Sequence, residues 1–161
     1  MQGDKSMAYC KALDLAQYVA TKYKNKYKAE ISSLKLQKSL YFLFAYWGGF
    51  VRKGKGKTTE LKETLKEKLF DDKIQAWTYG PVVPNVYHAG TINSASDIVL
   101  HTDIKEFVDG LCDEMFEISD FKLVEIAHRD KCWQDHYDDN EEFHNNEIPK
   151  EEIISEYALK I

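Results

Sequence analysis

The 161 residues suit one compact domain and leave no room for a second full domain. With 43% hydrophobic residues, no apolar run of about 18 residues and no apolar N-terminal segment, the composition excludes a disordered chain and disfavours a membrane-spanning or exported protein. The net charge is −5, and it is unevenly distributed. Residues 1–70, the basic part, contain 15 Lys and Arg against 6 Asp and Glu, whereas residues 71–161, the acidic part, contain 7 Lys and Arg against 21 Asp and Glu.

Two helices are predicted in the first third of the chain. Apolar residues recur at helical spacing over residues 9–27, which predicts an amphipathic helix. Ser32 or Ser33 can cap a second helix, SLKLQKSLYFLFAYWGGF, which is apolar almost all round. We expect this second helix to be central and buried, and to end at Gly48 and Gly49.

A basic glycine loop and a charged helix are predicted next. The loop begins at Val51, and the helix runs from Thr58 or Thr59 to about residue 70 with glutamates among lysines at i, i+3 and i+4 distances. The KGKGK element lacks the Lys-Ser/Thr pair of a phosphate-binding loop, and no apolar strand precedes it. Phosphate binding is therefore disfavoured.

The stretch IQAWTYGPVVPNVYHAG concentrates aromatic residues and prolines. Residues 74–79 alternate as a strand, and Gly80 with Pro81 should end it because proline removes a backbone donor. Pro84 suits the first turn of a short helix that closes at Gly90.

The remaining elements are mostly helical. Residues 98–101 are predicted as a short strand, Asp103 as the cap of a helix to about residue 118, and Ser119 or Asp120 as the cap of another helix. That second helix should turn Phe121, Val124 and Ala127 inward, and a last helix should start after Ile148-Pro149. The predicted fold class is mainly α (α+β), a compact helical domain around a central buried helix with a small β element.

One constellation suggests metal or nucleophile chemistry. His128, Cys132 and His136 stand at i, i+4 and i+8, and Asp135 or His144 could complete a zinc site if one helix ran through them. Cys132 beside either histidine would equally suit a thiol nucleophile. Because no second Cys/His pair follows at zinc-finger spacing, metal binding and catalysis are both disfavoured.

The aromatic stretch suits protein binding. Trp77, Tyr79 and Tyr87 offer large rings with polar tips and little rotamer freedom, a combination enriched at interfaces. The alternative is that Trp77 and Pro81 pack on the central helix and only hold the corner rigid.

Four blocks of the sequence resemble those of a known family. LKLQKSLYFLFAYWGG, LFDDKIQAWTYGPVVPNVYHAG, LVEIAHRDKCWQDHY and IPKEEIISEY are similar, in order, to the main blocks of the Panacea domain of SocA-like, phage-associated antitoxins, from about Leu13 to Tyr157. The resemblance implies one mainly helical domain over residues 1–161 that neutralises a protein toxin encoded beside it. Two departures stand out: Cys132 occupies a position where the family usually has proline, and the charged segment 53–70 enlarges a connection that is often shorter.

The resemblance and the aromatic stretch together give the expected site and function. The expected partner-binding residues are Trp77, Tyr79, Pro81, Pro84, Tyr87, His128 and Trp133. We expect a cytoplasmic antitoxin of a bacterial or phage-infected cell that masks a cognate toxin, with no enzyme activity, cofactor or metal.

Two alternatives remain open. The first is a phage or prophage protein whose acidic part binds and inhibits a host defence or regulatory factor. The second is a Cys/His-dependent hydrolase. Direct nucleic-acid binding is disfavoured, since the lysines near the end of the first helix accompany no reading motif.

Overall fold

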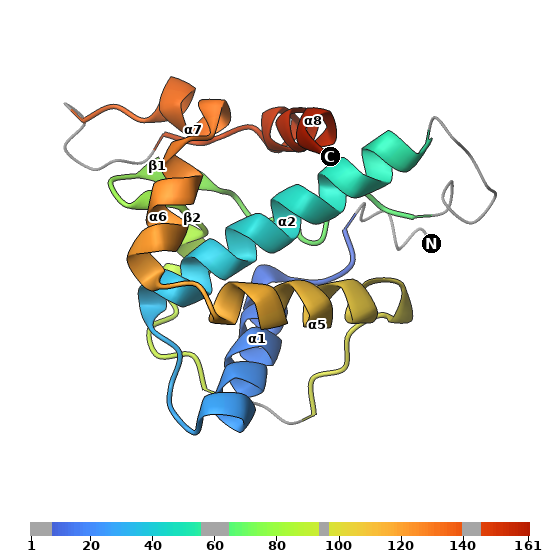
Figure 1. Cartoon of the computed structure of the whole chain (residues 1–161), viewed down its shortest axis with the longest axis vertical. Coiled ribbons are helices and arrows are strands. Elements are labelled where there is room, and N and C mark those ends of the chain that lie inside the picture. Colours follow the sequence, from blue (N-terminus) through green and yellow to red (C-terminus); the bar gives the residue numbers. More distant parts are fainter. Residues whose placement is uncertain (1–7, 56–64, 94–96, 140–145) are drawn as a thin grey trace.

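The computed structural model describes residues 8–55, 65–93, 97–139 and 146–161 (Figure 1). The fold is mainly α with one small antiparallel sheet of two strands, as predicted. The elements in chain order are α1 Ala12–Tyr27, α2 Ser33–Lys55, β1 Gln75–Trp77, β2 Gly80–Val82, α4 Pro84–Tyr87, α5 Thr102–Phe116, α6 Asp120–His128, α7 Lys131–His136 and α8 Lys150–Lys160.

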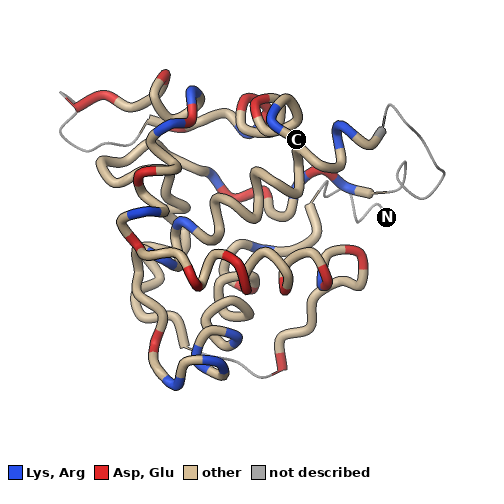
Figure 2. Tube along the Cα trace, viewed as in Figure 1, with Lys and Arg blue, Asp and Glu red and all other residues tan. Residues whose placement is uncertain are grey.

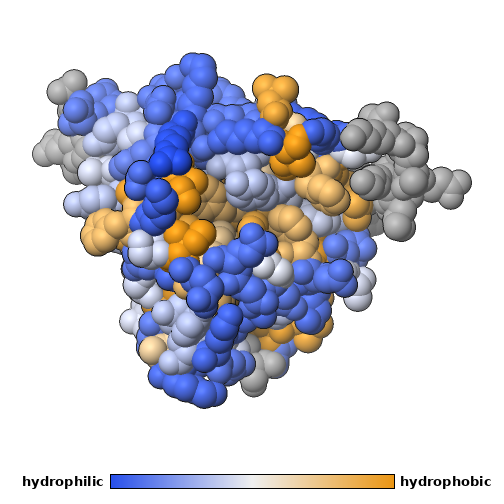
Figure 3. Space-filling view, in the orientation of Figure 1, coloured by the Kyte–Doolittle hydropathy of each residue, from blue (hydrophilic) through white to orange (hydrophobic). Residues whose placement is uncertain are grey.

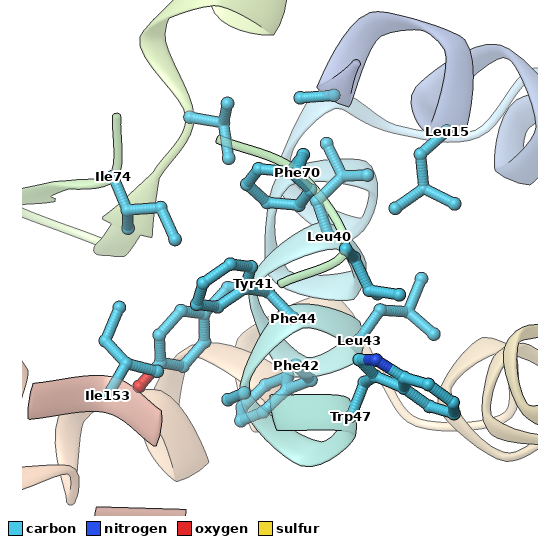
Figure 4. Packing of buried hydrophobic residues seen from close by; sticks show 14 of the residues in the cluster. Leu15, Leu40, Tyr41, Phe42, Leu43, Phe44, Trp47, Phe70, Ile74 and Ile153 are labelled. Atoms are coloured by element: carbon cyan, nitrogen blue, oxygen red, sulfur yellow. The ribbon is translucent and has the colours of Figure 1, made fainter. Parts of the chain in front are cut away.

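Helix α2 is the centre of the molecule, and the other helices surround it (Figure 1). Ser32 caps its start, since the Ser32 Oγ accepts a hydrogen bond from the Lys35 N–H at 3.0 Å. Leu40 and Phe44 are fully buried, and residues from α1, α5, α6 and α8 join them in one core cluster (Figure 4). The prediction of a central buried helix is confirmed. Among the described residues, no helix is long and apolar enough to cross a membrane.

The predicted end of this helix is wrong. α2 continues past Gly48 and Gly49 to Lys55, so residues 51–55 are helical instead of forming a loop. The glycines are needed because α8 crosses at this point: a Cβ on Gly49 would lie 2.7 Å from the Tyr157 carbonyl carbon and 2.8 Å from the Ala158 nitrogen. Gly48 and Gly49 therefore allow α2 and α8 to pack closely and do not end the helix.

The predicted charged helix lies mostly outside the described residues, which omit 56–64. Residues 65–70 are not helical: Lys68 forms a parallel bridge with Ala8, and Glu67 pairs with Arg52 at 2.8 Å. This part of the prediction is wrong, because contacts with distant residues hold this segment in a non-helical conformation.

The strand predicted at residues 74–79 is shorter: β1 covers Gln75–Trp77, and residues 78–79 form the turn of a hairpin with β2. β1 pairs with β2 so that Ala76 faces Pro81 and Trp77 faces Gly80. The expectation that Gly80 and Pro81 end the pairing is wrong. Opposed residues in an antiparallel pair alternate between bonded and non-bonded positions, and proline fits one that needs no N–H.

Three smaller predictions near α5 and α6 are also wrong. Residues 98–101 form no strand, and the α5 cap is His101, whose ring accepts from the Asp103 N–H at 3.0 Å. Phe121 is 72% exposed instead of facing inward. The Ser119 cap of α6, the short helix at Pro84 and the last helix after Pro149 are confirmed.

The basic and acidic parts of the sequence pair with each other. In the folded chain, basic and acidic positions are interspersed in space (Figure 2). The ion pairs that join the two parts include Lys22–Asp109, Lys22–Asp113, Lys26–Glu117, Lys35–Asp120 and Arg52–Glu151. The fold therefore neutralises much of the charge asymmetry internally.

Candidate protein-binding surface

Three aromatic side chains form a surface at the hairpin and α4. Trp77 ends β1, Tyr79 lies in the turn, and Tyr87 ends α4. Tyr79 is 58% exposed and Tyr87 is 50% exposed. The Trp77 and Tyr87 rings meet edge to face with centroids 4.9 Å apart, so side chains from two elements make one continuous surface.

Side chains from α2 hold this hairpin from below. The buried Gln37 amide accepts from the Val83 N–H at 2.8 Å and donates to the Val83 carbonyl at 3.3 Å. The Lys38 Nζ donates to the Pro81 carbonyl at 2.8 Å. Gly80 has a φ of +109°, and a Cβ there would lie 2.9 Å from the Lys38 Cε. The hairpin backbone is therefore fixed before any partner binds.

Side chains from α6 and α7 hold the hairpin from its other side. The Trp133 indole N–H donates to the Trp77 carbonyl at 2.9 Å, and the Trp133 ring stacks between His128 at 4.2 Å and Tyr137 at 4.7 Å. The His128 Nε2 lies 3.1 Å from the Thr78 carbonyl, to which it donates when protonated there. Segments far apart in sequence thus meet at the turn.

The seven residues expected to bind a partner fall into three groups by exposure. Tyr79 and Tyr87 face solvent, while Pro81 is buried and Trp133 is 9% exposed. The other three are partly buried: Trp77, Pro84 and His128. The structure brings all seven to the hairpin and its supports, but most of them hold the surface in place from beneath.

A groove runs past Tyr87. It consists of a hollow of about 490 Å³ on the hairpin side and one of about 450 Å³ toward Gly90. The two hollows share Ser33, Gln37 and Tyr87, so they adjoin. The first is also lined by Leu34, Lys38, Trp77, Thr78, Tyr79 and Val82, and the second by Glu30, Ile31, Leu36, Val86, Gly90, Thr91 and Ile92.

Lys38 gives the first hollow its charge. Its side chain is 0% exposed, and within the described ranges no carboxylate oxygen lies within 4.0 Å of its Nζ. Burial lowers the pKa of Lys38 to about 7. Sequence reasoning gave this lysine no role, because α2 contains other lysines and nothing in the sequence sets Lys38 apart from them.

The predicted line of His128, Cys132 and His136 does not form. α6 ends at His128 and α7 starts at Lys131, so the three residues do not share a helix face. His128 binds the hairpin turn, and His136 pairs with Glu152 at 2.8 Å. His144 lies outside the described residues.

A different cluster has the spacing of metal ligands, but its atoms are engaged. Within the part of the chain that the structure describes, Asp130, Cys132 and Glu156 come together. Asp130 accepts hydrogen bonds of 2.5 Å each from Tyr41, Tyr157 and Lys160. The Lys160 ammonium already supplies a cation there, which makes this cluster a structural one.

The other two members of that cluster, Glu156 and Cys132, are also unsuited to metal binding. Glu156 accepts from the N–H groups of Lys131 and Cys132 at the start of α7. Burial raises the pKa of the Cys132 thiol to about 12. A thiol that stays protonated at neutral pH is a weak nucleophile, so the arrangement does not favour cysteine chemistry.

A second apolar groove lies elsewhere on the molecule. Hydrophobic side chains gather between α5 and α6, over α2 (Figure 3). They line a hollow of about 270 Å³ formed by Phe42, Tyr46, Leu111, Glu114, Met115, Ile118, Leu123 and Ile126. It is smaller than the hairpin groove and is not lined by a buried cation.

The comparisons with known proteins agree with the resemblance seen in the sequence. No curated protein and no solved structure matches the chain. Residues 59–134 match the family model described as antitoxin SocA-like, Panacea domain. The matched range contains the hairpin, α4, α5, α6 and the first part of α7, whereas α1, α2 and α8 lie outside it. Residues 59–134 of this chain are therefore similar to the SocA-like, Panacea domain of antitoxins.

Proposed function

We propose that this protein is an antitoxin that binds and masks a cognate protein toxin through the surface formed by Trp77, Tyr79 and Tyr87. The family match supports an antitoxin role in general. The observation that supports this surface is the exposure of Tyr79 and Tyr87 on a backbone held by Gln37 and Lys38.

Physical reasoning favours such a surface for tight binding. Tyrosine and tryptophan rings bury large areas at low entropic cost, and they dominate binding energy at many interfaces. A backbone that is already fixed avoids the cost of ordering it on binding. The hairpin combines both features.

We further propose that the functional unit is the whole chain, residues 1–161, and that it acts in the cytoplasm of a bacterial or phage-infected bacterial cell. The matched segment shares its core with α1, α2 and α8, which supports one domain. Masking requires no catalysis or cofactor, and the protonated Cys132 thiol is consistent with this.

The structure gives less support to inhibition of a host factor through the acidic part. That hypothesis needs a concentrated acidic face, whereas Lys22, Lys35 and Arg52 each pair with carboxylates of the acidic part. Exposed pairs of this kind also weaken long-range attraction to a basic partner.

Co-expression with the product of the adjacent gene tests the proposal. We expect that product to stop bacterial growth alone, and this protein to restore growth and to co-purify with it. Tyr79→Ala combined with Tyr87→Ala should weaken the complex at least tenfold, because each truncation removes a large contact. Leu159→Ala, at an 88% exposed position on α8, is the control and should bind normally. A harmless neighbour with no complex would refute the antitoxin role, and normal binding by the double variant would refute the surface.

A further inference from the structure

We infer that the groove beside Tyr87 binds a segment of the protein partner that places an aspartate or glutamate side chain over Lys38, between apolar side chains. This inference rests on the proposed function and specifies the chemistry of the partner. It depends on three features of the groove: the charge of Lys38, the apolar side chains that line the groove, and its continuation on both sides of Lys38.

Within the described residues, the Lys38 ammonium has no acidic partner. Among the residues that line the first hollow, Lys38 is the one with a cationic side chain, and no acidic side chain lines that hollow. An ammonium has three N–H donors, and the described residues offer the Lys38 Nζ one acceptor, the Pro81 carbonyl. A buried cation with only a neutral acceptor is costly, and a carboxylate from a partner would offset that cost.

The N-terminal end of α2 adds positive electrostatic potential to the same hollow. Ser33 and Leu34 line the hollow, and the first turn of α2 contains no acidic residue. The N-terminal end of a helix carries partial positive charge. Asp120 reaches Ser32 and Lys35, but it does not line the hollow.

The direction of the groove indicates that the partner's carboxylate belongs to an Asp or Glu side chain and not to a C-terminus. Beyond Tyr87 the groove continues into the second hollow, whose walls include Ile31, Val86 and Ile92. A segment lying in the groove can therefore extend in both directions from Lys38. Glu30 also lines the second hollow but is paired with Lys24 at 2.6 Å, so the apolar side chains there favour an apolar residue of the partner.

The surroundings of Lys38 make a carboxylate preference strong. Lys38 is 0% exposed, and Trp77 and Val82 line the same hollow. Charges attract more strongly where water is excluded. We expect a glutamate in the partner segment to bind at least tenfold more tightly than glutamine at the same position.

Selection from a random peptide library displayed on phage tests this inference without any toxin. The full-length protein is the bait, and Lys38→Met, which has a similar volume but no charge, is the matched control. We expect wild-type protein to enrich peptides with one Asp or Glu beside apolar residues, and Lys38→Met to lose that acidic preference. One enriched peptide is then synthesised in Glu and Gln forms, and its affinity is measured by titration while NMR follows the Trp77 indole N–H.

The outcomes separate clearly. A tenfold preference for the Glu form that disappears in Lys38→Met supports the inference. Equal binding of the two forms to wild-type protein overturns it, even if Lys38→Met fails to fold. The absence of enriched peptides, or displacement of the Glu form by inorganic phosphate, also overturns it. A carboxylate preference without a toxin complex would refute only the proposed function, and a toxin complex without that preference would refute only the inference.

Discussion

Two buried charged side chains, Asp130 and Lys38, have opposite surroundings. Asp130 is 1% exposed and accepts hydrogen bonds from Tyr41, Tyr157 and Lys160. Lys38 is 0% exposed and has the Pro81 carbonyl as its acceptor. Asp130, whose charge is fully hydrogen-bonded, ties α2 and α8 together. Lys38 holds the hairpin through a single neutral acceptor, and burying its charge this way costs stability.

The cost of burying Lys38 should depend on pH. Its pKa is lowered from 10.5 to about 7 in the folded protein, so the unfolded chain binds more protons than the folded chain between about pH 7 and 10.5. The free energy of unfolding of the wild type therefore increases as the pH rises through that window, because the folded protein no longer has to bury a charged Lys38. Lys38→Met lacks this gain, so its stability relative to wild type should fall by about 1 to 2 kcal/mol from pH 7 to pH 8.5.

Urea unfolding of both proteins at several pH values measures this difference. The thiols of Cys10, Cys112 and Cys132 have pKa values raised to about 12 by burial, and they oppose the trend at higher pH. Both proteins contain them, so the difference between the two cancels their effect. A difference that stays constant with pH would contradict the assignment of a lowered pKa to Lys38.

At the scale of elements, the close crossing of α2 and α8 depends on Gly49. A Cβ on Gly49 would meet backbone atoms of Tyr157 and Ala158, which cannot move without shifting α8. Gly49→Ala should therefore lower the free energy of unfolding by about 1 to 3 kcal/mol, although alanine is the better helix former.

Gly110→Ala is the matched control for this substitution. Gly110 lies in α5, and no heavy atom lies within 4 Å of the place of its Cβ. Alanine there should raise the free energy of unfolding by about 0.5 to 1 kcal/mol. Opposite shifts of the two melting temperatures are expected; a stabilising Gly49→Ala would show that the helices do not cross as described.

Elements set by local chemistry were predictable from the sequence. The Ser32 and Ser119 caps, the strand alternation around Ala76 and the short helix at Pro84 depend on residues within a few positions. The end of α2 was not predictable, because the reason for Gly49 lies in α8, about a hundred residues later. Contacts across the fold override such local signals.

The candidate site was likewise only partly predictable from the sequence. Trp77, Tyr79 and Tyr87 could be proposed from composition, since rings close in sequence on a hairpin remain close in space. His128 and Trp133 came from the family resemblance, and only the fold explains their contact with the hairpin. The role of Lys38 could not be predicted, because it depends on the Pro81 carbonyl and on the lack of a carboxylate oxygen within 4.0 Å among the residues that the structure describes.

At the scale of the whole molecule, the two halves of the sequence depend on each other. The basic first part supplies α1 and α2, and the acidic second part supplies α5, α6 and α8. The charged pairs between them are mostly exposed, so each contributes little alone. Their larger effect is to lower the repulsion within each half, while the shared apolar core provides most of the stability.

This dependence predicts how fragments of the protein behave. The family match covers residues 59–134, but the centre of the core, including Leu40, Tyr41 and Phe44, lies in α2 outside that segment. Without α2, the inner faces of the hairpin, α5 and α6 have nothing to pack against, so an isolated 59–134 fragment should show little helix by far-ultraviolet circular dichroism and no cooperative unfolding. The full chain should unfold in one transition, with circular dichroism and tryptophan fluorescence giving the same midpoint, since Trp47, Trp77 and Trp133 report from different regions. Cooperative unfolding of the fragment, or separate midpoints in the full chain, would show that the family segment is a domain of its own, and that α1, α2 and α8 are additions to it.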